Sequence, residues 1–147
     1  MTEAEILDLL EKRYSFWREE WVFFRHVRVG AGWGLPWERT MDAWAMNCYP
    51  SRDFRSIAFE VKVSRSDFLK ELKDPGKRAA AYKVSNQIFF VAPSGLLKVA
   101  EIPEDSGLIV AKNGRLRQLK RAPCREREGL DVRFIVSILR QAKRNER

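Results

Sequence analysis

Apolar residues repeat with a helical period at the start of the chain and with a strand period after it. The spacing of Ile6, Leu7, Leu10 and Tyr14 predicts a helix over residues 2–14. Thr2 is placed to be its N-cap, with Glu5 as the capping-box partner. Three β-branched and aromatic runs then predict strands at residues 21–29, 39–48 and 56–64, the last two joined as a hairpin.

The strand at residues 56–64 has charges on one face only. Alternate side chains on a strand share a face. The side expected to face the core carries Ile57, Phe59, Val61 and Val63. The other side carries Ala58, Glu60, Lys62 and Ser64. An acid and a lysine are therefore held together on one face of a sheet.

The second half of the chain continues the alternation of helix and strand. Ser64 and Asp67 form a capping-box pattern that begins a helix, which Pro75 and Gly76 interrupt before it resumes over residues 77–84. The apolar run 87–92 predicts a strand covered on both faces, beside the strand of Glu60.

A hairpin and a closing helix complete the predicted elements. Asn113-Gly114 between residues 107–112 and 115–119 is typical of a hairpin with a type I′ turn. Residues 131–143 predict a helix with one apolar stripe, formed by Val132, Ile135, Val136 and Leu139. The order of elements indicates an α/β (α+β) fold, a central mixed sheet flanked by helices, in a single domain of residues 1–147.

Charge and composition narrow the class of protein. The formal charge is +8, and residues 112–127 alone carry seven cations against one acid, Glu126. A polyanion such as nucleic acid fits this surplus, although a basic surface also serves solubility alone. Cys48, Cys124 and His26 lack the spacing of a structural zinc site. No signal peptide or membrane-spanning run is evident, so we expect a cytoplasmic protein without a membrane partner.

The candidate chemistry depends on how the hairpin pairs. If it turns about Ser51, Asp42 faces Glu60 with Cβ atoms about 5 Å apart, and both carboxylates reach one hard cation such as Mg²⁺. Lys62 on the same face would then orient or deprotonate a nucleophile beside the ion. A slip of one residue separates the two acids. Glu-x-Lys is also a common surface pattern, so these three residues alone leave a structural role open.

Further residues resemble a known family. Asp42, then Glu60-Val61-Lys62, then a helix and an apolar strand, is similar to the PD-(D/E)XK nuclease superfamily, whose core has the order αβββαβ. The run from Glu60 to Phe68, the strand 88–93 and the segment 102–110 resemble the MmcB-like group of DNA repair proteins within it. The resemblance covers roughly residues 39–110. Met41 stands where the superfamily name has proline.

The resemblance implies a restriction-endonuclease-like core and a division of roles. Asp42 and Glu60 would be metal ligands, with the carbonyl of Val61 as a further ligand and Lys62 as the catalytic lysine. The cofactor would be Mg²⁺, with Mn²⁺ able to substitute. An acid of the first helix often joins such a site, and Glu5 or Glu11 would serve.

Basic and aromatic residues around this site are candidates for nucleic-acid binding. Many superfamily members carry Gln-x-x-x-Tyr on the helix after the lysine; this chain has Arg78 and Tyr82 at that spacing, one helical turn apart. Arg39, Arg65 and Lys77 also flank the site, where they would contact phosphates or simply face solvent. Trp33 and Trp37 would stack on bases or cap an edge of the core.

Three functions follow from these expectations. The first is a metal-dependent DNA endonuclease in a repair or mobile-element context. The second is a catalytically inactive DNA-binding module of the same fold, in which Glu60 and Lys62 form an ion pair. The third is a basic protein-interaction domain. A homodimer is expected if both strands of a duplex are cut, because that requires two sites.

Overall fold

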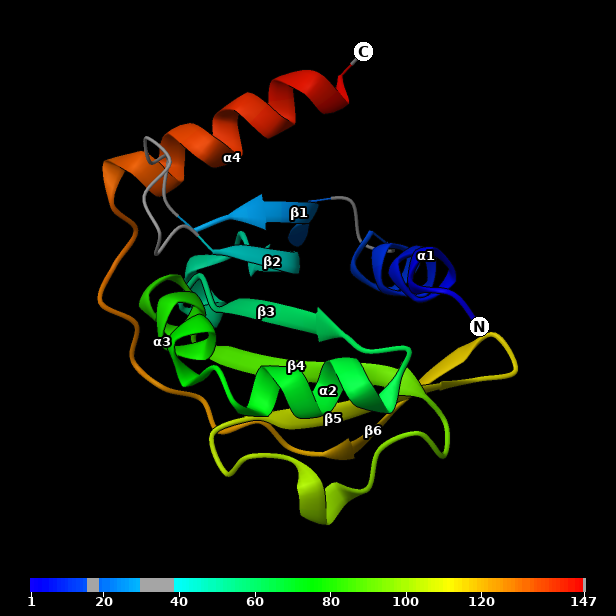
Figure 1. Ribbon diagram of the computed structural model, residues 1–147. Coiled ribbons are helices and arrows are strands. Elements are labelled where there is room, and N and C mark those ends of the chain that lie inside the picture. The colour runs from blue at the N-terminus through cyan, green and yellow to red at the C-terminus, as the bar shows by residue number, and fades with distance from the viewer. Residues whose placement is uncertain (16–18, 30–38, 147) are drawn as a thin grey trace.

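The computed structural model describes residues 1–15, 19–29 and 39–146 and builds them around one six-stranded sheet (Figure 1). The strands lie across the sheet in chain order, β1 to β6. Their bounds are Trp21–Arg28, Thr40–Asn47, Ser56–Val61, Gln87–Pro93, Gly107–Lys112 and Arg115–Lys120. β3, β4 and β5 are parallel, and the remaining neighbours are antiparallel. The predicted mixed sheet is confirmed.

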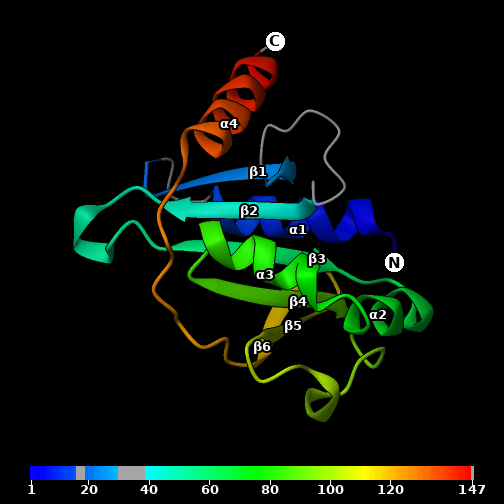
Figure 2. The ribbon, with the colours of Figure 1, turned by 60° about the vertical axis from the view of Figure 1, so that its left-hand side comes forward.

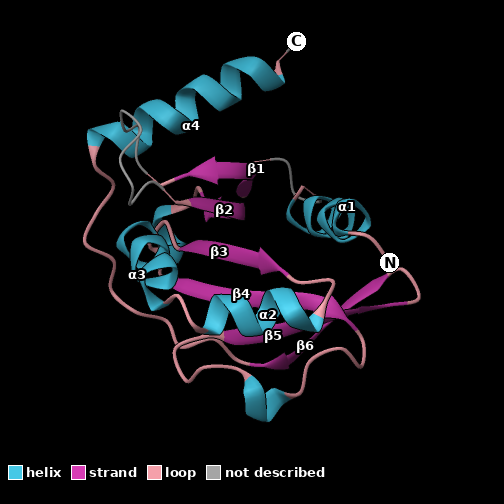
Figure 3. Cartoon of the chain, in the orientation of Figure 1, coloured by secondary structure: helices cyan, strands magenta, loops and turns pink. Residues whose placement is uncertain are grey.

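Helices cover both faces of this sheet (Figure 3). Their bounds are Glu3–Tyr14 for α1, Arg65–Leu72 for α2, Pro75–Val84 for α3 and Val132–Asn145 for α4. Among the described helices, α1 packs on one face, and α2, α3 and α4 pack on the other. The predicted cap of the first helix is present: Glu5 N donates to Thr2 Oγ1 at 3.2 Å, and the Glu5 carboxylate accepts from Thr2 N.

The residues of β3 alternate between the two cores as their spacing predicts. Ile57, Phe59 and Val61 pack against α1, whereas Ala58 packs under α3. Val63 does not join the core and is 38% exposed. β3 ends at Val61, so the alternation has stopped before it reaches Val63.

The β2–β3 hairpin has the register on which the candidate chemistry depends. Ala43 pairs with Phe59 and Met46 with Ser56, which centres the connection on Ser51. A short 3₁₀ turn, Pro50–Arg52, forms the tip. Asp53 follows it with a left-handed φ of 55°, which aspartate tolerates better than most residues.

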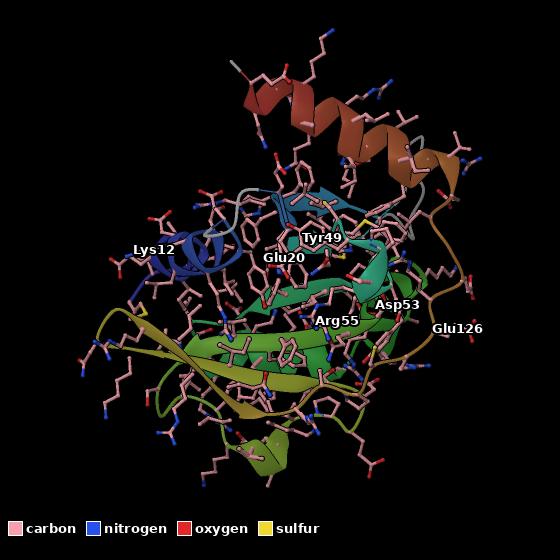
Figure 4. All side chains as sticks on the ribbon, turned by 180° about the vertical axis from the view of Figure 1, so that it is seen from behind. Lys12, Glu20, Tyr49, Asp53, Arg55 and Glu126 are labelled. Carbon is pink, nitrogen blue, oxygen red and sulfur yellow. The ribbon has the colours of Figure 1, made fainter. Side chains whose placement is uncertain are left out.

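The chain returns from β6 to β1 through an extended strap, residues 121–131 (Figure 2). Arg127 holds the strap to the β2–β3 turn, since its Nη1 donates to Phe54 O at 2.7 Å and to Ser56 Oγ at 2.9 Å. From behind, the strap segment that bears Glu126 is seen beside the turn that bears Asp53 (Figure 4). At least one of the surplus basic residues, Arg127, therefore stabilises the fold through hydrogen bonds.

α4 docks through a different stripe from the predicted one. Phe134 is buried edge-on against Trp44 with ring centroids 5.0 Å apart, and Ile138 and Ala142 pack beside it. Val132 is 74% and Leu139 62% exposed. The predicted stripe of Val132, Ile135, Val136 and Leu139 was therefore wrong, because a large aromatic residue on the neighbouring stripe buries more apolar area against the sheet.

Candidate active site

The sequence-predicted acids lie where β2 and β3 separate. Glu60 is the last residue but one of β3, pairs with Phe90 of β4 and is only 2% exposed. The described pairs of β2 with β3 end at Ala43 and Phe59. Beyond them the Asp42 side chain takes the place of a backbone acceptor, because Asp42 Oδ2 accepts from Val61 N at 2.8 Å. The two carboxylates thus flank the end of the hairpin.

Lys62 follows β3 directly and is fixed at both ends. Its backbone N donates to Val91 O of β4 at 2.9 Å. Its Nζ lies 2.5 Å from Glu71 Oε1, and the lysine is 8% exposed. Ion pairs of such low exposure need both partners, since either charge alone would be desolvated without compensation.

Glu71 is a site residue that the sequence reasoning missed. Ser64 caps α2 by accepting from Asp67 N, which directs the helix back over the sheet. Phe68 and Glu71 are its two buried residues, and Phe68 packs edge-on against Phe90 with ring centroids 5.4 Å apart. The signal was present: Glu71 lies three positions after Phe68, so an acid shares the apolar face of the helix.

Lys77 completes a group of two acids and two lysines. It lies in the first turn of α3, which Pro75 begins. Its Nζ is 3.0 Å from Glu71 Oε1 and 3.1 Å from Glu60 Oε2, the second contact lacking the direction of a hydrogen bond. Lys77 was expected to contact phosphate; the structure places it between two buried carboxylates.

The electrostatics of this group oppose a bare carboxylate at Glu60. Burial, and then the neighbouring charges of Glu71 and Asp42, raise the pKa of Glu60 well above its usual range, and Lys77 acts against them. Burial alone would lower the pKa of Lys77, but Glu60 and Glu71 outweigh it and raise that pKa. A cation near Glu60 favours the ionised form of its carboxylate.

The site retains unsatisfied ligand atoms. Glu60 Oε2 and Glu71 Oε2 are buried and have no hydrogen-bond partner among the described residues. Beside them is an open pocket of about 380 Å³, lined by Asp42, Val61, Lys62 and Glu71 together with Glu3, Asp67, Lys70, Asp74 and Lys77. Carboxylate oxygens that lack donors, next to a pocket that Asp42 and Glu71 line, fit a hard divalent cation.

The first-helix acid nearest the site is Glu3, which differs from the expectation of Glu5 or Glu11. Glu5 is occupied by the helix cap, and Glu11 pairs with Arg25 at 3.3 Å. Ligand atoms of Glu3, His26 and Asp42 lie within 4.8 Å of one another. The N-terminal end of α1 points toward the end of the hairpin, so its first acid is the one that arrives there.

The flanking arginines do not all converge on the pocket. Arg39 Nη2 lies 3.6 Å from Asp74 Oδ1, near the pocket rim. Arg65 turns away, forming two hydrogen bonds with Glu101 and one with Leu96 O. The Arg65 guanidinium also lowers the pKa of the Glu101 carboxyl to about 2.

Arg78 and Tyr82 lie on another face of α3 and line a separate pocket of about 360 Å³, with the strap on its far side. Arg78 Nε lies 3.6 Å from Asp105 Oδ1, and the Arg125 guanidinium lies 4.2 Å from the centre of the Tyr82 ring. The structure therefore does not bring this pair to the pocket that Asp42 and Lys62 line. Trp33 and Trp37 lie outside the described residues.

Comparisons with known proteins identify a fold and no activity. No family model matches the chain, and no curated protein matches it. A solved structure described as the SPO1766 protein of unknown function, from Silicibacter pomeroyi, matches with a TM-score of 0.63 and 19% identity, covering 99% of this chain and 88% of that one. At this identity the match shows a shared fold. Within the described residues, no helix has the length and apolarity to cross a membrane.

Proposed function

We propose that the chain is a metal-dependent nuclease that hydrolyses phosphodiester bonds in DNA. The observation that carries the proposal is the meeting of Asp42, Glu60 and Lys62 at the end of one hairpin, beside an open pocket. Two acids that can hold a metal ion and a lysine beside them suit phosphodiester hydrolysis. The resemblance to PD-(D/E)XK nucleases in the motif residues supports the same function.

Each residue has a role in this proposal. Asp42 and Glu60 would hold Mg²⁺ or Mn²⁺, with the Val61 carbonyl as a further ligand and Glu3 near Asp42. The bound ion would lower the pKa of a water ligand and offset charge on the phosphate. Lys62, as an ammonium, would donate to the attacking water or to the phosphate and balance the developing charge.

Glu71 acts in the proposal as a positioning residue. Its Oε1 holds the Lys62 ammonium at 2.5 Å and so fixes where that charge lies relative to Glu60. A lysine on a flexible four-carbon stem would otherwise occupy many positions. Buried pairing thus prepares Lys62 before substrate arrives, which lowers the reorganisation that the reaction requires.

The net charge of +8 supports a polyanionic substrate, and phosphate contacts of this kind are independent of base sequence. Arg39 near the pocket rim is the described arginine placed to contact a phosphate next to the one that is cut. Arg78 and Tyr82 would contact the nucleic acid farther along α3, at their own pocket.

A second candidate has its own supporting observation. Lys77 and Lys62 already neutralise Glu60 and Glu71 through contacts of 2.5 to 3.1 Å. A complete ion-pair group without any metal suits a DNA-binding module that has no catalytic activity. In that case the four charges would stabilise the fold and have no part in turnover.

The deciding experiment is cleavage of labelled single-stranded, duplex and branched DNA with Mg²⁺, Mn²⁺ or EDTA. We expect the wild type to cut at least one form, and Glu60→Gln, Lys62→Ala and EDTA each to abolish cutting while salt-dependent DNA binding persists. Asp67→Asn is the matched control, since Asp67 lines the same pocket but makes no described contact with the two lysines. Binding without cleavage of any form would favour the inactive module.

A further inference from the structure

Lys77 has the position that a bound cation would be expected to take. Its ammonium lies 3.1 Å from Glu60 Oε2 and 3.0 Å from Glu71 Oε1, between two carboxylates that are 2% and 5% exposed. Among the described residues, Lys77 is the sole ion-pair partner of Glu60, because Lys62 pairs with Glu71 instead. Glu60 therefore depends on Lys77 for its countercharge.

The Glu60 oxygen that Lys77 contacts is also one that a divalent ion would use. Glu60 Oε2 has no hydrogen-bond donor, and Lys77 contacts it as a charge without hydrogen-bond geometry. When the ammonium leaves Glu60 it gives up no directional bond to that carboxylate, because its hydrogen bond is to Glu71 Oε1, at 3.0 Å. A divalent ion at Glu60 would be repelled by an ammonium about 3 Å from the same oxygen, so the two cations exclude each other.

Lys77 is also the more exposed of the two lysines. Its side chain is 25% exposed and borders the open pocket, whereas that of Lys62 is 10% exposed. The Lys77 stem begins in the first turn of α3, which is attached to α2 through Lys73 and Asp74. The ammonium can therefore swing into the pocket without any change in the sheet.

We propose that Lys77 is a displaceable counter-ion of Glu60, and that a divalent cation binds this site only by displacing it. The inference rests on the proposed metal-dependent function and adds a property that the motif residues do not imply. Lys77 holds the acids together before metal arrives and lowers the apparent affinity for metal. When no metal is bound, Lys77 thereby offsets the repulsion between the carboxylates of Glu60 and Glu71.

Calorimetric titration with Mn²⁺ tests the proposal. We expect Lys77→Met to bind Mn²⁺ about tenfold more tightly than the wild type or better, because apparent affinity falls with the fraction of molecules whose site is open. Lys70→Met is the matched control: Lys70 lines the same pocket and is exposed, but it makes no ion pair among the described residues. Its affinity should stay close to that of the wild type.

A measurement on the wild type tests the proposal even if Lys77→Met does not fold. Acetic anhydride labelling followed by mass spectrometry should show Lys77 becoming more reactive when Mg²⁺ is added, while Lys62 stays protected. Lys77→Gln provides a second variant that removes the charge but keeps polarity.

The outcomes separate this inference from the proposed function. Equal Mn²⁺ affinity in the wild type and Lys77→Met, or an equal gain in Lys70→Met, would overturn the counter-ion role and leave the nuclease proposal standing. Unchanged Lys77 reactivity on metal binding would overturn it in the same way. Failure of every protein to bind Mn²⁺ at millimolar concentration would overturn both.

Discussion

Glu71 is the residue that both lysines of the candidate site share. Its Oε1 lies 2.5 Å from Lys62 Nζ and 3.0 Å from Lys77 Nζ. Lys77 has a second acid, Glu60, but Lys62 has no other acid within ion-pair distance among the described residues. The stability of the site should therefore depend more on Glu71 than on any other acid.

We expect Glu71→Ala to lower the free energy of unfolding by about 3 to 5 kcal/mol, because it leaves the buried Lys62 ammonium without a partner. Urea unfolding followed by circular dichroism measures the loss. Asp8→Ala is the control, since Asp8 pairs with Arg25 at 2.6 Å but its side chain is 70% exposed, and its loss should stay within about 1 kcal/mol. Equal losses in the two variants would contradict the importance of the buried pair.

At the scale of single residues, the sequence predicted on which face of the sheet a side chain lies better than it predicted which side chains contact one another. The period of two placed Glu60 and Lys62 opposite the α1 core, and the hairpin centre at Ser51 set the register of Asp42. Those are properties of a single strand and its turn. Glu71 and Glu3 join the site only because helices fold back onto the sheet, and a tertiary contact of this kind has no local signal beyond an acid on an apolar face.

Helices, strands and turns form largely where the local sequence pattern predicts them. They differ from the prediction where tertiary contacts determine which face is buried. The Asn113-Gly114 turn has φ values of 52° and 73°, as its sequence predicts. β3 ends at Val61, and Lys62 directly after it keeps a backbone hydrogen bond to β4 while its side chain reaches Glu71. The sequence of α4 has two apolar stripes, and the packing of Phe134 on Trp44 shows which of them is buried.

Gly107 is required because β5 lies very close to Phe89 of β4 and to Ala122 of the strap. A Cβ there would lie 2.6 Å from Phe89 Cε1 and 2.7 Å from Ala122 N. We expect Gly107→Ala to lower the free energy of unfolding by about 1 to 3 kcal/mol through overpacking. Thermal and urea unfolding provide the measurement.

Gly76→Ala in α3 is the matched control for that prediction. Its Cβ would meet Asp74 Oδ1 at 3.4 Å, an ordinary contact, and alanine favours a helix by about 0.5 to 1 kcal/mol over glycine. A stable Gly107→Ala variant would mean that β5 and the strap separate more easily than their spacing indicates.

At the scale of the whole molecule, the basic surplus divides into structural and free charges. Arg127 Nη1 donates to Phe54 O, Ser56 Oγ and Asn86 Oδ1 at 2.7 to 3.0 Å, and burial lowers the pKa of its guanidinium. Arg121 in the same strap is exposed and has no described hydrogen bond or ion pair. Net charge alone could not distinguish the two.

We expect Arg127→Ala to cost about 1.5 to 3 kcal/mol of unfolding free energy, as for a hydrogen-bonded charged group. Arg121→Ala should change it by no more than about 0.5 kcal/mol. Hydrogen exchange should also show faster exchange in the strap and the β2–β3 turn of Arg127→Ala only. Similar exchange in both variants would mean that other contacts hold the strap.

Strand order has a consequence for how the chain folds. Because the six strands lie side by side in chain order, each new strand can add to the edge of those already formed as the polypeptide leaves the ribosome. α4 is an exception, since the last helix must pack on Trp44 beside the first strand. Docking of α4 therefore joins segments more than 100 residues apart, as the contact of α1 with β6 also does, and we expect these long-range contacts to determine the rate of the final folding phase.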